Sequence, residues 1–150
     1  MRTLAAVAML TVVVSSAGAR ADAVKNAEPQ SIQPAELAKF LRSPKNKKPL
    51  LIQVGFRVLY EQAHIPGSEY IGPASEDEAL GRLRARVKAL PRSTFIVLYC
   101  GCCPWSKCPN VKPAYAALRA LGFKNVKVLR LADNFGADWV DKGYPVAKGR

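Results

Sequence analysis

Three largely apolar runs, separated by helical segments, limit most strongly how this chain can fold. They lie at residues 50–54, 95–99 and 126–131. A strand that is apolar on both faces is typical of a parallel sheet covered by helices. A crossover between parallel strands needs about a dozen residues or more, which the helical segments supply. The sequence therefore predicts an α/β fold with a mainly parallel sheet and helices on both faces.

Apolar residues recur at helical spacing around these strands. The first predicted helix has Pro34 in its first turn, and the second begins at the capping box Ser75-x-x-Glu78. Pro91 and Gly122 end the second and third helices. The predicted helices cover residues 34–43, 75–90 and 114–121, with a short one around Trp139.

The N-terminus has the pattern of a signal peptide. Arg2 precedes a short apolar stretch, and small residues at alternate positions place the cleavage site between Ala19 and Ala23. With no second long apolar run, we expect a protein that does not span the membrane and is periplasmic or secreted. The chain then divides into a signal peptide (1–21), a polar lead-in (22–30) and one folded domain (31–147).

The chain is strongly basic. Its 23 Lys and Arg outnumber 11 Asp and Glu, giving a net charge of +12. Such a balance favours anionic partners. Aromatic and basic residues do not alternate as they do in a nucleic-acid-binding surface, so we expect no nucleic-acid partner.

Four cysteines lie within nine positions, directly after the second apolar run and before a helix: Cys100, Cys102, Cys103 and Cys108. Ligand sites in parallel α/β sheets lie beyond the carboxyl ends of the strands, near helix N-termini. The positive end of a helix favours a thiolate, which is the nucleophilic form of cysteine. The cluster therefore predicts a reactive thiol.

Two other interpretations of the cluster are structural disulfides and a metal site. Disulfides suit an oxidising compartment. The spacing Cys100-x-x-Cys103 is typical of metal ligands, but no second CxxC and no nearby histidine completes a tetrahedral set. Pro104 follows Cys103 where haem attachment requires histidine. We therefore predict no metal and no cofactor.

Three separated segments resemble the rhodanese family of sulfurtransferases. Residues 51–54 followed by 63–68 (LIQV, AHIPGS) are similar to the first family signature, an LIDVR strand and then GHIPGA. Residues 96–100 (IVLYC) resemble the strand that delivers the catalytic cysteine. Residues 126–129, with the later segment from Trp139 to Val146, resemble the closing strand, helix and G-x-P turn. The resemblance implies a five-stranded, mainly parallel sheet.

The resemblance also implies an activity. In that family the cysteine matching Cys100 takes sulfane sulfur from a small anionic donor such as thiosulfate and holds it as a persulfide. It then passes the sulfur to a thiol or a cyanide-like acceptor. The residues in place of the family's active-site loop, expected to bind the donor, are Gly101, Cys102, Cys103, Pro104, Trp105, Ser106 and Lys107. Backbone N–H groups there and the following helix would stabilise the anion.

Some positions depart from the family pattern. Gln53 and Gly55 replace an Asp and an Arg, so a polar contact of the site is expected to be missing unless Arg57 substitutes. Residues 134–135 (Asn-Phe) replace a double glycine before Trp139. His64, the one histidine, matches the HIPG turn and is interpreted as structural, and Trp139 as a core residue.

The extra thiols keep two other functions open. The first is a thiol–disulfide oxidoreductase that uses Cys100 with Cys103 and Cys108 and works with a redox partner protein. The second is a non-catalytic binding module that presents the cysteine-rich loop to a protein or a soft metal ion.

Overall fold

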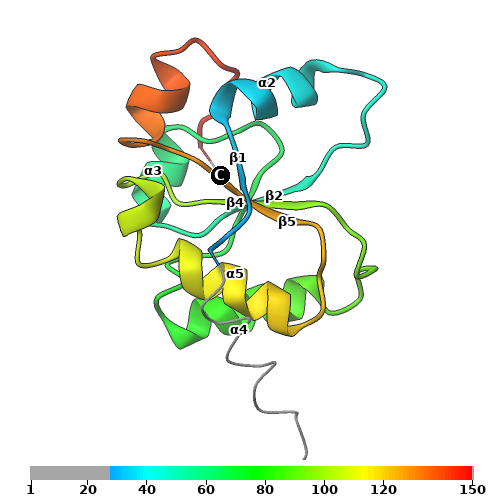
Figure 1. Ribbon diagram of the computed structural model, residues 1–150. Coiled ribbons are helices and arrows are strands. Elements are labelled where there is room, and N and C mark those ends of the chain that lie inside the picture. Colours follow the sequence, from blue (N-terminus) through cyan, green and yellow to red (C-terminus); the bar gives the residue numbers. More distant parts are fainter. Residues whose placement is uncertain (1–27, 150) are drawn as a thin grey trace, which may run out of the picture.

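A five-stranded parallel sheet forms the centre of the molecule (Figure 1). The computed structural model describes residues 28–149. The strands are β1 (Ser31–Ile32), β2 (Leu50–Gln53), β3 (Glu69–Tyr70), β4 (Ile96–Tyr99) and β5 (Val126–Leu129). Their order across the sheet is β1-β5-β4-β2-β3, and every strand pair is parallel. The predicted α/β fold with a five-stranded sheet is confirmed.

Helices cover both faces of this sheet. They are α2 (Pro34–Arg42), α3 (Arg57–Gln62), α4 (Asp77–Val87), the short η1 (Trp105–Lys107), α5 (Val111–Ala120) and η2 (Gly136–Val140). Helices α4 and α5 lie on one face, and α2 and η2 on the other (Figure 1). Within residues 28–149, no helix has the length and apolar character needed to cross a membrane.

The sheet separates two hydrophobic cores because alternate residues of each strand point to opposite faces. In β4, Ile96 and Leu98 pack toward α4 and α5, whereas Val97 and Tyr99 belong to the opposite core. Trp139 lies in that second core with no exposed surface, which confirms it as a core residue. The largely apolar runs of the sequence thus reflect strands buried on both sides.

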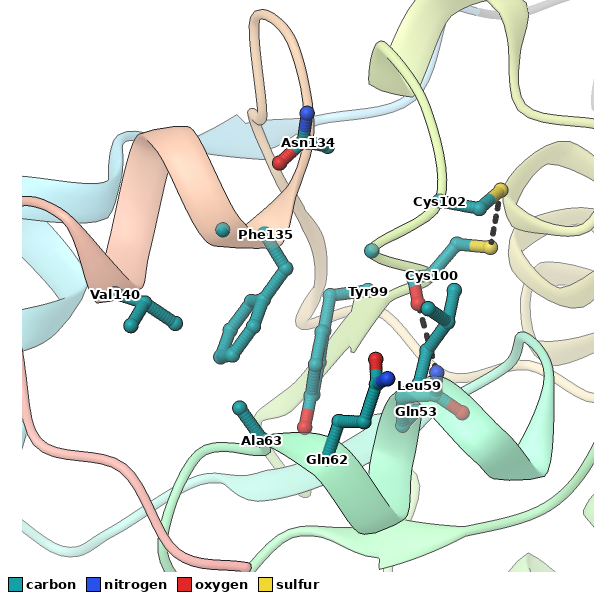
Figure 2. Close-up of a pocket in the computed structure, with 12 residues that line it drawn as sticks. Gln53, Leu59, Gln62, Ala63, Tyr99, Cys100, Cys102, Asn134, Phe135 and Val140 are labelled. Atoms are coloured by element: carbon teal, nitrogen blue, oxygen red, sulfur yellow. Dashed lines mark hydrogen bonds between the residues drawn. The ribbon is translucent and has the colours of Figure 1, made fainter.

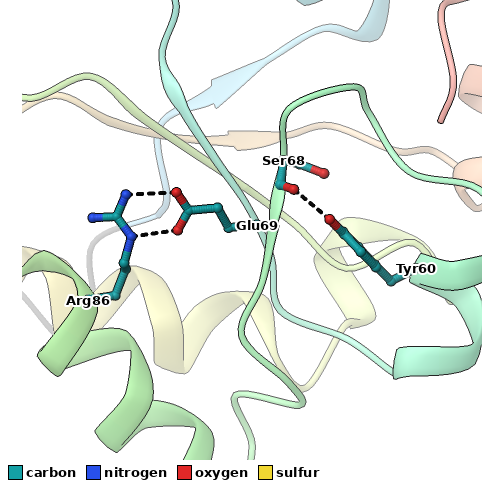
Figure 3. A network of polar contacts seen from close by, with 4 residues as sticks. All are labelled: Tyr60, Ser68, Glu69 and Arg86. Atoms are coloured by element: carbon teal, nitrogen blue, oxygen red, sulfur yellow. Dashed lines mark hydrogen bonds and ion pairs between the residues drawn. The ribbon is translucent and has the colours of Figure 1, made fainter. Parts of the chain in front are cut away.

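Contacts to its neighbours hold the edge strand β3. Arg86 of α4 donates two hydrogen bonds to the Glu69 carboxylate, at 2.6 and 2.7 Å (Figure 3). The Tyr60 hydroxyl donates to the Ser68 carbonyl at 2.6 Å. The ion pair is partly exposed, so it fixes geometry more than it adds stability.

The predicted capping box of α4 is wrong. Glu76, rather than Ser75, is the N-cap residue, and no side chain caps this helix end. Ser75 lies one residue too early for its hydroxyl to reach the first turn. Its backbone N–H instead donates to Asn110 Oδ1 at 2.9 Å. The third helix, α5, also begins three residues before its predicted start.

The signal peptide (1–21), its cleavage site and most of the polar lead-in lie outside the described residues. They stay predictions from the sequence. From Gln30 onward the chain already joins the fold, since the Gln30 carbonyl accepts a hydrogen bond from the Val128 N–H at 2.8 Å.

Candidate functional site

Cys100 directly follows β4, at the carboxyl end of the middle strand of the sheet. The chain then turns at Gly101, whose φ of +98° suits glycine. The Gly101 carbonyl accepts a hydrogen bond from the Phe135 N–H at 3.1 Å, and the Trp105 N–H donates to the Leu131 carbonyl at 3.0 Å. The segment after β5 therefore holds the cysteine loop at two points.

The four thiols are free and gathered at this strand end. The sulfurs of Cys100, Cys102 and Cys108 all lie within 4.8 Å of one another. Figure 2 shows the Cys100 and Cys102 sulfurs side by side, 3.3 Å apart. The Cys103 sulfur instead contacts Cys102, at 3.1 Å. The nearest neighbours of the Cys100 thiol are thus Cys102 and Cys108, whereas the oxidoreductase hypothesis also needs Cys103.

Hydrogen bonds lower the pKa of the Cys100 thiol from 9.0 to about 6. The largest cause is the Cys108 thiol, which donates to the Cys100 thiolate. The Cys102 N–H and the Asn110 side-chain amide, with Nδ2 at 3.5 Å from the sulfur, act in the same direction. Burial opposes them, since Cys100 is only 3% exposed. The balance leaves Cys100 mostly a thiolate at neutral pH.

The two neighbouring thiols stay protonated. Burial and the hydrogen bonds to Cys103 and Cys100 raise the pKa of Cys102 to about 12. The hydrogen bond to Cys100, together with burial, raises the pKa of Cys108 well above its ordinary value. The N–H groups of Asn110 and Val111, where α5 begins, act in the opposite direction and lower the pKa of Cys108, but the causes that raise it outweigh them.

Gln53 makes two polar contacts at the candidate site. Its Nε2 donates to the Cys100 carbonyl at 2.7 Å (Figure 2), and its Oε1 accepts from the Gly55 N–H at 3.0 Å. Arg57 does not take the place of the family's Arg, because its guanidinium lies 3.9 Å from Glu61 and 4.4 Å from the Tyr70 ring centre. Gln53 thus joins β2 to the residue that follows β4.

Gly55 lets two chain segments approach closely at the reactive sulfur. A Cβ atom at this position would lie 2.8 Å from both the carbonyl oxygen and the sulfur of Cys100. The large side chain that the family has here would not fit this arrangement. Glycine at position 55 is therefore matched to the placement of Cys100.

Replacing Gly55 with alanine is expected to destabilise the protein by about 1–3 kcal/mol, because the added methyl group must displace Cys100. The measurement is urea unfolding. Gly81→Ala is the matched control: Gly81 lies within α4 with open space around its Cβ, so alanine is expected to gain up to about 1 kcal/mol there. Equal effects of the two substitutions would contradict the close approach at Cys100.

A pocket of about 440 Å³ lies beside this strand end. Gly101 and Cys102 line it, together with the side chains of Gln62 and Phe135. The Phe135 ring stacks on Tyr99 with ring centres 5.4 Å apart, and forms one wall (Figure 2). Phe135 thus takes the place of the family's glycine and narrows the pocket.

The other predicted donor-binding residues lie around the turn before α5. Cys103, Pro104 and Trp105 are half-buried, and the Trp105 ring lies under the Arg130 guanidinium at 5.5 Å. Ser106 and Lys107 are exposed. None of these five lines the pocket beside Cys100.

Asn110 is the functional residue that the sequence analysis missed. It is 1% exposed. Its side-chain Oδ1 accepts a hydrogen bond from the Ser75 N–H, and its Nδ2 donates to the Cys100 sulfur. The acceptor Oδ1 is fixed by Ser75, so the donor Nδ2 must face the thiol. The predicted helix began at residue 114, so Asn110 lay outside it, and its two partners lie ten and 35 positions away.

The interpretation of His64 as a structural residue is confirmed. It is 5% exposed, its Nδ1 lies 2.7 Å from the Tyr60 carbonyl, and its ring stacks on the Tyr60 ring at 3.9 Å. Its backbone also pairs with Ala147. His64 therefore fixes the turn rather than serving the thiol.

Comparisons with solved structures show the same fold. The rhodanese-like domain of an Anabaena protein is 24% identical over 81% of this chain and 80% of its own, with a TM-score of 0.58. A single-domain sulfurtransferase from Saccharomyces cerevisiae is 20% identical over 79% of this chain and 94% of its own, with a TM-score of 0.56. A thiosulfate sulfurtransferase from Pseudomonas aeruginosa is 24% identical over 81% of this chain but 20% of its own, with a TM-score of 0.59.

Among curated proteins, no match was found. The family model for the rhodanese-like domain matches residues 33–131, which is more than half of the chain and includes every strand except β1. The sheet order, the cysteine at the end of β4 and this match agree. The chain therefore belongs to the rhodanese-like domain family.

Proposed function

We propose that this protein is a sulfurtransferase that carries sulfane sulfur as a persulfide on Cys100. The donor is a small anion such as thiosulfate, and the acceptor is a thiol or a cyanide-like nucleophile. One observation carries the proposal: the Cys100 sulfur, at the carboxyl end of β4, lies 3.5 Å from the Asn110 amide donor and 3.3 Å from the Cys102 sulfur, and its surroundings lower its pKa to about 6. This arrangement stabilises the nucleophilic thiolate that attacks the donor.

The transfer has two steps. In the first, the Cys100 thiolate attacks the outer sulfur of thiosulfate, the sulfur–sulfur bond of the donor breaks, and sulfite leaves with the electron pair. In the second, the acceptor nucleophile attacks the outer sulfur of the Cys100 persulfide and regenerates the thiolate. Neither step needs an oxidant or a reductant. The negative charge passes from the Cys100 sulfur to the outer sulfur of the persulfide in the first step and returns to the Cys100 sulfur in the second.

The surroundings of the thiol suit an anionic donor. The net charge of +12 attracts anions toward the protein. Cys100 is only 3% exposed, and it lines the pocket of about 440 Å³ together with the half-buried Cys102. Shielding from water strengthens the hydrogen bonds to the sulfur anion. The similar structure from Pseudomonas aeruginosa is named a thiosulfate sulfurtransferase, which supports thiosulfate as the first donor to test.

Intact-mass measurement tests this function. The wild-type protein, reduced and then incubated with thiosulfate, is expected to gain one sulfur atom, and fragment ions are expected to locate it on Cys100. The Cys100→Ser variant is expected to gain none. Adding cyanide to the sulfur-loaded protein should remove the extra mass and release thiocyanate. A wild-type protein that gains no sulfur, or gains it on another cysteine, would overturn the proposal.

The signal-peptide pattern of residues 1–23 adds a proposed location. It supports export to the periplasm or out of the cell. The N-terminal sequence of the protein recovered from a cell fraction tests this: a mature chain that starts between residues 20 and 24 is expected.

A further inference from the structure

The site holds more thiols than sulfur transfer requires. One cysteine forms and discharges a persulfide, yet two further thiols, Cys102 and Cys108, lie against Cys100. A thiol beside a persulfide can attack it and end the transfer as a disulfide. Besides stabilising the Cys100 thiolate, these two thiols could therefore serve a chemistry beyond the transfer.

The three sulfurs have the geometry of metal ligands. They come from the end of β4, from the loop and from the residue two before the N-cap of α5, and lie within 4.8 Å of one another. A metal ion bonded to three thiolates at about 2.3 Å holds them about 4 Å apart. The Cys100 and Cys102 sulfurs are 3.3 Å apart, which is shorter than this value. The other sulfur–sulfur distances are at most 4.8 Å, so none exceeds it by much. Small side-chain shifts therefore suffice to bring all three sulfurs to one ion.

We propose that Cys100, Cys102 and Cys108 form a three-coordinate site for a soft monovalent ion, Cu(I). Thiolate ligands select Cu(I) and zinc among biological metals. Structural zinc sites almost always take four protein ligands. Within residues 28–149, the group holds three thiols and no His, Asp or Glu, and the Cys103 sulfur turns toward Cys102. Three soft ligands and no fourth fit Cu(I) better than zinc.

Neighbouring groups stabilise the anionic site that copper binding would create. The Asn110 side-chain amide donates to the Cys100 sulfur, with Nδ2 at 3.5 Å, and is itself held by the Ser75 N–H. Such outer hydrogen bonds orient the ligands of a metal. Cys100 and Cys108 are each only 3% exposed, so the protein would shield the ion from water. Binding would release the thiol protons of Cys102 and Cys108 to solvent.

Copper and the persulfide would compete, because both use the Cys100 sulfur. The copper-loaded protein is expected to gain no sulfur from thiosulfate. Only this expected competition rests on the proposed sulfur transfer. The binding of Cu(I) does not, and it is measured without any sulfur donor.

The test is an anaerobic titration of the reduced full-length protein with Cu(I), in competition with a chromophoric Cu(I) chelator. One Cu(I) per chain is expected, and X-ray absorption should count three sulfur neighbours. Cys102→Ser and Cys108→Ser are each expected to weaken the affinity at least about 100-fold, since even groups behind the ligands change metal affinity by about 10–100-fold. Cys103→Ser is the matched control, expected to bind as the wild type does. Circular dichroism checks that each variant folds.

Several results would overturn the copper site. One is the absence of bound Cu(I) in the wild-type protein. A second is that folded Cys102→Ser or Cys108→Ser keeps the wild-type affinity. A third is that Cys103→Ser loses affinity as Cys102→Ser and Cys108→Ser do, while the wild-type protein binds Zn²⁺ through four sulfurs. The cluster would then be a zinc site. If thiosulfate adds no sulfur while Cu(I) binds to three sulfurs, the transferase proposal fails and the copper proposal stands.

Discussion

Replacing Cys108 with alanine is expected to raise the pKa of the Cys100 thiol from about 6 toward its ordinary 9.0, because the variant loses the largest stabilising contact of the thiolate. Below the pKa, each unit of increase lowers the thiolate fraction about tenfold, while a more basic thiolate regains about threefold in intrinsic reactivity. A rise of two units is therefore expected to slow alkylation at pH 5 about tenfold. At pH 9 both thiols are largely ionised, so the more basic thiolate of the variant is expected to react several-fold faster than that of the wild type.

The measurement is the pH dependence of iodoacetamide labelling of Cys100, located in the tryptic peptide 93–107. The conservative variant Cys108→Ser keeps an O–H donor, so its labelling midpoint is expected to stay close to that of the wild type. A loss of packing alone would affect neither midpoint. If Cys108→Ala leaves the midpoint near 6, the hydrogen bond between the two thiols does not activate Cys100.

Replacing Gln53 with leucine is expected to destabilise the protein by about 2–6 kcal/mol. Leucine has a similar volume and is apolar, but it leaves the Cys100 carbonyl and the Gly55 N–H without their partner. Each buried polar group left unpaired costs about 1–3 kcal/mol. Gln53 is 1% exposed, so water cannot replace the lost contacts without opening the site.

Urea unfolding measures this cost. Gln62→Leu serves as the control, because Gln62 is exposed on α3 at the rim of the same pocket. An exposed substitution of this kind is expected to change stability by less than about 0.5 kcal/mol. If Gln53→Leu costs no more than Gln62→Leu, the bridge between β2 and β4 does not stabilise the fold.

The regular part of the fold was predictable because it depends on local patterns. The runs at 50–54, 95–99 and 126–131 became β2, β4 and β5, since strands buried on both faces are apolar at most positions. The strands β1 and β3 have two residues each, too few for a periodic pattern. The helix before Pro91 was found, but its cap was misplaced because Ser75 serves a tertiary contact.

The candidate site was predictable only in its position. A cysteine cluster after an apolar strand indicates a reactive strand end, and the structure places Cys100 there. The contacts that set its chemistry join residues far apart: Gln53 lies 47 positions from Cys100, and Ser75 lies 35 from Asn110. A local pattern contains no signal for such pairs. For the same reason, the sequence does not show which two of the other thiols lie next to Cys100.

The two hydrogen bonds from the segment after β5 determine how short a working protein can be. The family match ends at residue 131, but the Phe135 N–H that holds the Gly101 carbonyl lies beyond it. A protein ending at residue 131 would keep every strand and all four cysteines, yet the chain leaving Cys100 would lose one of its two anchors, as well as Trp139 from the core. The smallest unit that presents the thiol correctly therefore extends past the conventional boundary of the domain.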